Sequence, residues 1–147
     1  MRDSNPQSAV KVPEDAVSRP WLSTHPEQSP TDDFWAFAEL AKTAQQHGIF
    51  LSIGVIERSL IGSTVWCTNL LFGPDGTLLS KHRKLKPTGA ERMIWHEGED
   101  VNPVTPHGDP EAEAREADNM RVVDTKIGKL GANICWESEC NLVRNPG

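Results

Sequence analysis

The strongest candidate for chemistry in this sequence is Cys135, which ends the apolar run that begins at Leu130. The pattern predicts a strand over 129–135 that passes directly into a helix, so the cysteine would stand at a sharp strand-to-helix turn. Such a turn exposes a side chain, and the positive end of the helix that follows lowers the pKa of a thiol. The backbone N–H of Trp136 would then be placed to donate to an oxyanion. The residues alone fit a nucleophilic thiolate and a buried strand cysteine equally well.

A second candidate is Lys84, which lies in the basic segment 81–92. Held inward at the end of a strand, its ammonium could stabilise negative charge that develops on a substrate atom. Two plainer interpretations stay open: solvated lysines at a strand end, or a basic patch for phosphates or targeting. No aromatic residues interleave with this segment for base stacking, which disfavours nucleic-acid binding. Glu91, in the same segment, fits a solvated charge or an ion pair with Arg92.

Length and composition narrow the function classes. The chain has 147 residues, which fits one domain or a piece of a larger one. Lys plus Arg total 15 and Asp plus Glu total 21, so the formal net charge is −6 and we expect no nucleic-acid partner. The apolar stretch 49–56 is too short to span a bilayer, and the first residues form no apolar leader. We therefore expect no membrane contact and a cytoplasmic location.

The cysteines argue against a disulfide framework. There are three, Cys67, Cys135 and Cys140, and no pair of them has Cys-x-x-Cys spacing. This pattern also argues against a structural zinc site. Cys67 lies in a predicted strand and is expected in the core, and Cys140 is assigned no role.

The first part of the chain is predicted to be an irregular, proline-rich arm over 1–30, followed by one domain over 31–147. Residues 1–33 hold five prolines and no glycine, which prevents any long helix there. Only 9–12 looks extended, and the arm is not expected to enter the core.

A helix is predicted after the capping cluster at 31–33. Its apolar face has three- and four-residue spacing and consists of Phe34, Phe37, Ala38, Ala41 and Ala44. Gly48 is expected to end the helix in a left-handed conformation. The almost continuously apolar segment 49–56 follows, which predicts a strand covered on both faces.

Two hairpins are predicted next. Residues 65–72 and 77–82 flank the turn 73–76, and residues 121–125 and 129–135 flank Gly128. Between the hairpins, 102–119 is expected to be a solvated acidic loop. The combination predicts an α/β fold, with one mixed sheet and helices on one face.

Four motifs in this order resemble the nitrilase branch of the carbon–nitrogen hydrolase (nitrilase/cyanide hydratase) superfamily: 54–58, 82–92, 123–128 and 131–137. The resemblance implies part of a four-layer α-β-β-α sandwich. By position it implies that Cys135 is the nucleophile, Lys84 the cation beside the tetrahedral intermediate, and Glu91 a second, positioning carboxylate.

The resemblance also implies a reaction. A nitrile or amide substrate would be hydrolysed through a thioimidate or thioester on the cysteine, without metal or cofactor. A full-length member of the family would be a homo-oligomer. Glu57 and Glu137 are expected to have structural roles, Glu137 in the first turn of the helix after the nucleophile.

The sequence departs from the family pattern at two places. The family's general-base glutamate belongs to a Phe-Pro-Glu-like strand, and neither Glu14 nor Glu27 has such flanks. The resemblance ends at Glu137, whereas the family's domain continues. We therefore expect a fragment with impaired activity. The alternative is a catalytically inactive chain that binds substrate or associates with full-length subunits.

Overall fold

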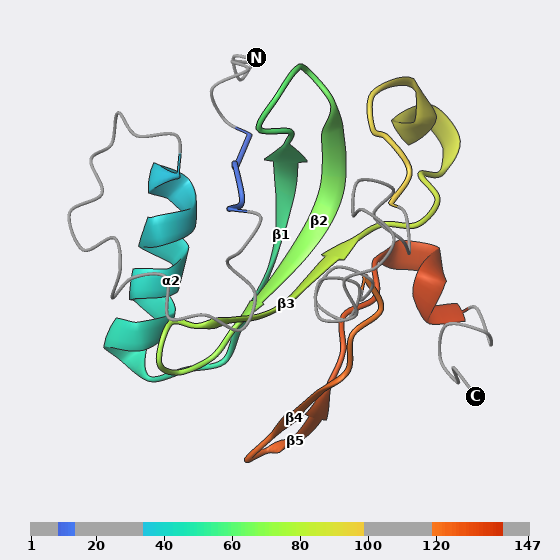
Figure 1. Cartoon of the computed structure of the whole chain (residues 1–147). Coiled ribbons are helices and arrows are strands. Elements are labelled where there is room, and N and C mark those ends of the chain that lie inside the picture. Colours follow the sequence, from blue (N-terminus) through green and yellow to red (C-terminus); the bar gives the residue numbers. More distant parts are fainter. Residues whose placement is uncertain (1–8, 14–33, 99–118, 140–147) are drawn as a thin grey trace, which may run out of the picture.

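The computed structural model describes residues 9–13, 34–98 and 119–139. Its elements are the helix α2 (Trp35–His47), the strands β1 (Leu51–Arg58), β2 (Val65–Phe72), β3 (Leu78–Arg83), β4 (Val123–Thr125) and β5 (Gly128–Leu130), and the 3-10 helices η2 (Gly89–Met93) and η3 (Cys135–Glu139). Figure 1 shows α2 on one side of the sheet β1–β2–β3, with η3 and the hairpin β4–β5 on the other side. The predicted α/β class is confirmed.

Helix α2 forms on the predicted apolar spacing. Phe37, Ala38, Ala41 and Ala44 are all buried against the sheet. Gly48 ends the helix in the left-handed conformation, with φ 61°, as predicted, and its N–H bonds to the last carbonyl groups of the helix. The N-cap is Phe34, which makes no side-chain capping bond. The predicted capping cluster 31–33 lies outside the described residues.

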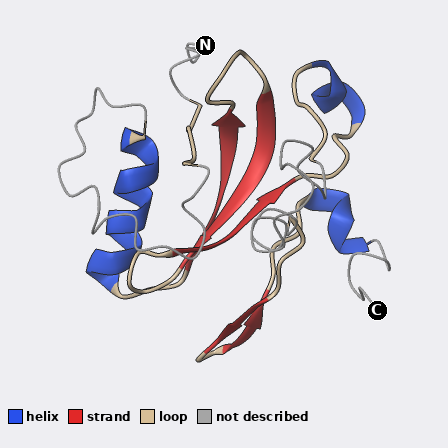
Figure 2. Cartoon of the chain, viewed as in Figure 1, coloured by secondary structure: helices blue, strands red, loops and turns tan. Residues whose placement is uncertain are grey.

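The core lies between α2 and one face of the sheet. The rings of Phe37 and Phe72 meet with their centroids 5.4 Å apart. Leu70, Phe72 and Leu78 complete the buried face. The expectation that 49–56 is covered on both faces is wrong, because alternate residues of β1 are exposed, including Ile56. The strand is covered on the α2 side and open on the other (Figure 2).

The extended piece near the start of the chain enters the core, contrary to expectation. Val10 forms a parallel bridge with Glu57, and its N–H and C=O bond to the backbone of Ile56 and Arg58. Val10 and Val12 are both buried. A short β-branched segment can therefore extend the edge of a sheet even among prolines, because only two backbone bonds are needed.

The strands form two sheets rather than the single mixed sheet expected. β1, β2 and β3 are antiparallel neighbours, and the β2–β3 hairpin turns at 73–76 as predicted. β4 and β5 form a separate antiparallel hairpin. The second strand of that hairpin ends at Leu130 and not at Cys135. Further along the chain, the N–H of Ile134 bonds to the side-chain carboxylate of Glu137 and not to a neighbouring strand.

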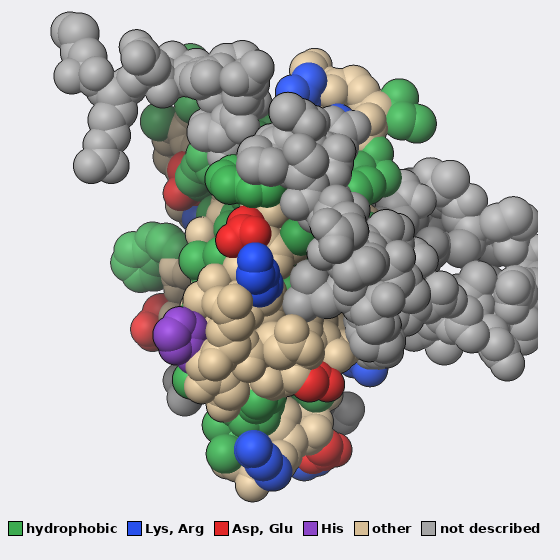
Figure 3. All heavy atoms as spheres, turned by 90° about the vertical axis from the view of Figure 1, so that its left-hand side faces the viewer, with side chains coloured by type: hydrophobic (Ala, Val, Ile, Leu, Met, Phe, Trp, Pro, Cys, Tyr) green, Lys and Arg blue, Asp and Glu red, His purple; other side chains and the backbone are tan. Residues whose placement is uncertain are grey.

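Figure 3 shows the α2 side of the molecule, where acidic and basic side chains, some of them side by side, are scattered among apolar and backbone atoms. Within the described ranges, no helix is both long and apolar enough to cross a bilayer. The predicted arm (apart from 9–13), nearly all of the acidic loop 102–119, and Cys140 lie outside the described residues.

Glu57 is a buried carboxylate that the sequence offers no means of finding. It accepts hydrogen bonds from Thr68 Oγ1 at 2.7 Å and from Arg83 Nη2 at 2.6 Å, and Lys81 Nζ lies at 3.3 Å. Arg83 also stacks on Trp66, at 3.8 Å from the ring centroid. Burial acts to raise the pKa of Glu57, but the bond from Arg83 and the charges of Lys81 and Arg83 outweigh it and lower the pKa.

Replacing Glu57 with glutamine should lower the free energy of unfolding at pH 7 by about 2–3 kcal/mol, because the half-buried cations Lys81 and Arg83 lose their buried anionic partner. Since the folded pKa lies below the ordinary 4.5, the stability that this carboxylate contributes is present above pH 4.5 and is lost as the pH falls through the lowered value. Urea denaturation between pH 3 and pH 7 should show the difference between the two proteins shrinking in acid. A difference that is constant with pH would contradict this account.

Candidate active site

Lys84 is the residue directly after β3, and its side chain is only 2% exposed. Its N–H donates to the carbonyl of Cys67 at 2.8 Å, and its own carbonyl accepts the N–H of Gly98 at 2.8 Å. The backbone is thus bound on both sides where the strand ends. This confirms that the lysine is held inward, which excludes the interpretation as a solvated strand end.

Glu91 lies in η2 and meets the lysine directly. Lys84 Nζ lies 2.6 Å from Glu91 Oε2, and the same oxygen accepts the N–H of Thr88 at 2.9 Å. The hydrogen bonds from Lys84 and from Thr88 lower the pKa of Glu91. The interpretation of Glu91 as the ion partner of Arg92 is wrong, because Arg92 Nε donates to the carbonyl of Pro87 and Glu91 pairs with Lys84.

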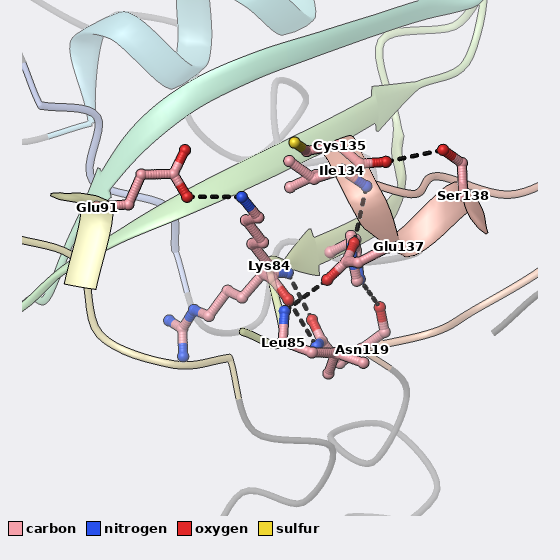
Figure 4. Close-up of polar contacts among 10 residues, drawn as sticks. Lys84, Leu85, Glu91, Asn119, Ile134, Cys135, Glu137 and Ser138 are labelled. Atoms are coloured by element: carbon pink, nitrogen blue, oxygen red, sulfur yellow. Dashed lines mark hydrogen bonds and ion pairs between the residues drawn. The ribbon is translucent and has the colours of Figure 1, made fainter. Parts of the chain in front are cut away.

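The ammonium form of Lys84 is favoured by its surroundings. Burial acts to lower its pKa, but the hydrogen bond and charge of Glu91, followed by the negative charges of Cys135 and Cys67, outweigh it and raise the pKa. Figure 4 shows Lys84, Glu91 and Cys135 converging from the end of β3, from η2 and from η3.

Cys135 begins a helix as predicted, but the direct passage from strand to helix is wrong, because the four residues 131–134 separate it from the end of β5. It is the first residue of η3, it is exposed, and its φ of 59° is the only left-handed value at a non-glycine residue within the described ranges. Strained backbone of this kind concentrates at functional sites. The helix that follows has five residues, so its dipole is much smaller than the sequence argument assumed. The alternative of a buried strand cysteine is wrong.

Two further site predictions concern the neighbours of the thiol. Trp136 is in η3, directly after the nucleophile candidate, and its side chain is exposed. The role of its N–H toward an oxyanion stays a prediction. Cys67 is half-buried beside Lys84 rather than in the core. Burial raises the pKa of its thiol, and the charge of Lys84 offsets part of that rise.

Sequence reasoning missed three features of the site. Gly98 binds the end of β3, His82 is fully buried, and the carboxylate of Glu137 reaches back to β3. No local sequence pattern marks these three residues, because each makes its contact with a segment that is distant in the sequence. Among the residues that the structure describes, no group of three or more His, Cys, Asp or Glu side chains could hold a metal ion.

Comparison of the sequence with known proteins shows the family of this chain. The profile of the carbon–nitrogen hydrolase family matches residues 12–145. The chain belongs to the carbon–nitrogen hydrolase family. The match continues past Glu137, where the motif resemblance was taken to end.

The relatives of this carbon–nitrogen hydrolase chain belong to the nitrilase branch. Nitrilase 1 of Arabidopsis thaliana is 41% identical over 107 residues, which is 73% of this chain and 25% of that protein. An aliphatic nitrilase of Sinorhizobium fredii is 42% identical over 106 residues, or 72% of this chain and 28% of that protein. Nitrilase 3 of Arabidopsis thaliana is 35% identical over 137 residues, or 93% of this chain and 28% of that protein. The chain thus matches about a quarter of the length of these relatives.

In this family member, Gly98 permits a close contact between its own backbone and the backbone of Arg83 and Lys84. A Cβ atom at Gly98 would lie 2.3 Å from the carbonyl oxygen of Arg83 and 2.8 Å from that of Lys84. Gly98→Ala should therefore lower the free energy of unfolding by about 1–3 kcal/mol and displace the end of β3. Urea denaturation measures the first effect.

Gly54→Ala is the matched control, since a Cβ at Gly54 would meet nothing within 4 Å. We expect that variant to be as stable as the natural protein or slightly more stable. Equal losses at the two glycines would contradict the steric account of Gly98.

Proposed function

We propose that this chain carries the catalytic centre of a nitrilase-type hydrolase, which converts a nitrile to a carboxylic acid and ammonia. The observation that carries the proposal is the exposed thiol of Cys135 on a strained turn, within electrostatic reach of the Lys84–Glu91 ion pair. The relatives named nitrilases support this choice of substrate class. The substrate is a small molecule, and no cofactor takes part.

The first half of the reaction forms a covalent intermediate. The thiolate of Cys135 adds to the nitrile carbon, and the nitrogen takes up a proton to give a thioimidate. Water adds to the thioimidate carbon and forms a tetrahedral species. The ammonium of Lys84 stabilises the negative charge that develops on the nitrile nitrogen in the first addition and on the tetrahedral species in the second, and the backbone N–H of Trp136 donates to the tetrahedral species. Glu91 holds the lysine amine in place through the 2.6 Å contact.

The second half releases the products. The tetrahedral species expels ammonia and leaves a thioester on Cys135. A second water attacks the thioester, which frees the carboxylic acid and restores the thiol. A positioned general base speeds such proton transfers by about 10²–10⁴-fold. In this chain neither Glu14 nor Glu27 has the flanks of the family's general-base segment. We propose that the 147 residues alone are an impaired catalyst, because they align with about a quarter of each relative and the remainder would complete the pocket.

Mass spectrometry tests the proposal on the chain as it is. The protein is incubated with an aliphatic nitrile such as butyronitrile, digested and mapped, while released ammonia is assayed. We expect a thioimidate or thioester on Cys135 and none on Cys67. If Cys135 stays unmodified by butyronitrile and by an aryl nitrile, yet is alkylated by iodoacetamide, the proposal fails.

A second candidate is an inactive chain that associates with longer subunits. Large apolar side chains exposed to solvent favour it: Ile56, Ile94, Trp136 and Met93. Light scattering after size exclusion, combined with the ammonia assay, separates the candidates. A folded, self-associating chain that forms no covalent adduct would support this second function.

A further inference from the structure

The carboxylate of Glu137 lies buried between the turn that carries Cys135 and the end of β3 (Figure 4). Its Oε2 atom accepts the backbone N–H of Ile134 at 2.7 Å and lies 2.6 Å from His82 Nε2. Its Oε1 atom accepts the backbone N–H of Leu85 at 2.6 Å, from 52 residues away in the chain. One side chain therefore binds two segments that are distant in sequence.

The two backbone donors are direct neighbours of the proposed reacting groups. Ile134 precedes Cys135, and Leu85 follows Lys84. Any displacement of the Glu137 carboxylate therefore pulls on the peptide next to the thiol and on the peptide next to the amine. Charge-assisted bonds to backbone N–H groups are among the stronger hydrogen bonds of proteins, so this link is stiff.

His82 holds the carboxylate from the opposite side and is itself fixed. Its ring is buried, with Nδ1 2.5 Å from the carbonyl oxygen of Asn119 and Nε2 on Glu137. A carbonyl oxygen only accepts, so Nδ1 carries a proton, and Nε2 donates to the ionised carboxylate. Asn119 is anchored in turn, because its side chain donates to the carbonyl of Arg83 at 2.8 Å.

The carboxylate is held in its ionised form. Burial acts to raise the pKa of Glu137, but the bond from His82 and the N–H groups of Ile134 and Leu85 outweigh it and lower the pKa. Three donors thus converge on one buried anion.

We infer that Glu137 is a positioning residue for the reaction proposed above: it holds the turn of Cys135 against the strand end of Lys84, so that the thiol can attack the nitrile carbon while the ammonium stabilises the charge that develops on the nitrogen. This inference rests on the proposed function. Alkylation depends on the lysine only through its charge, whereas capture of a nitrile needs both groups in register, and a misplacement of about 1 Å can cost about 10²-fold in rate.

Glu137→Gln is the informative change because it keeps the shape of the side chain. An amide has one acceptor oxygen, so its NH2 group must face either Leu85 N–H or Ile134 N–H, donor against donor. Glu139→Gln is the matched control, since Glu139 lies on the same short helix and is exposed. Urea denaturation of each variant confirms that it is folded under the assay conditions.

The first experiment compares two reactions of Cys135, adduct formation with butyronitrile and alkylation by iodoacetamide. For Glu137→Gln we expect the limiting rate of nitrile capture to fall about 10²-fold, with the half-saturating nitrile concentration within threefold of the natural protein and the alkylation rate lowered no further than Lys84→Met lowers it. Glu139→Gln should change neither reaction. Nitrile capture at the natural rate by Glu137→Gln would overturn the inference and leave the proposed function standing.

The second experiment needs no nitrile chemistry, so it decides the inference even if the natural protein fails to capture a nitrile and the proposed function falls. Lys84→Met should slow alkylation at fixed pH, because it removes a positive charge that interacts with the negative charge on the sulfur. We expect this effect to disappear when Glu137→Gln is also present. If Glu137→Gln does not fold, Glu137→Asp, which keeps the charge but is too short to reach all three donors, replaces it. If Lys84→Met slows alkylation as much in the Glu137→Gln protein, or in the Glu137→Asp protein that replaces it, as in the natural protein, the inference is overturned.

Discussion

Cys135→Ala should abolish covalent capture of a nitrile and lower ammonia release by roughly 10⁵-fold or more, to the background rate. The reason is that the sulfur forms the bond to substrate in every intermediate, and alanine offers no atom in its place. Labelled peptide mapping and the ammonia assay measure the two effects. Cys67→Ala is the matched control, because burial raises the pKa of the Cys67 thiol and makes it the weaker nucleophile at neutral pH.

The strained backbone at this position adds a stability test. Cys135→Gly should remove the same chemistry while leaving the free energy of unfolding unchanged or raising it by up to about 1 kcal/mol, because glycine adopts a φ of 59° without the Cβ penalty. A large loss of stability in this variant would mean that the cysteine side chain supports the fold. Residual nitrile capture by Cys135→Ala would mean that another residue is the nucleophile.

Lys84→Met should lower the rate of nitrile capture by about 10²–10³-fold. Methionine has a similar volume and keeps the buried position filled, so the loss reports the ammonium charge. Lys86→Met is the matched control, because Lys86 is two residues further along the chain and its side chain is 72% exposed. Stopped-flow or quenched mass spectrometry of Cys135 adducts measures the rates.

The pH dependence of stability gives Lys84→Met a second readout. The folded pKa of Lys84 is raised above the ordinary 10.5, so the stability from this group is fully present below pH 10.5 and is lost as the pH rises through the folded value. The difference in unfolding free energy between natural protein and variant should therefore be constant from pH 6 to pH 9. It should shrink only in strong alkali. Equal rates of capture by Lys84→Met and Lys86→Met would remove the lysine from the mechanism.

Local patterns predicted much of the fold. The apolar spacing of Phe37 and Ala41 gave the face of α2, because helical periodicity depends on neighbours three and four residues away. The bounds of β2 and the turn at 73–76 followed from strand composition and turn chemistry, which are equally local. The end of the second strand in the hairpin β4–β5 was not predicted correctly. Further along the chain, the N–H of Ile134 bonds to the carboxylate of Glu137, a contact that strand propensity does not describe.

The residue types and order of the motifs by themselves determined the family and the candidates Cys135, Lys84 and Glu91, because chemistry requires particular atoms at particular points of the chain. Only the tertiary structure decided that Val10 enters the core and that Glu137 joins the thiol's turn to the lysine's strand. The physical reason is sequence separation. Contacts between residues tens of positions apart depend on how buried faces and donors meet in three dimensions, and no local pattern records that meeting.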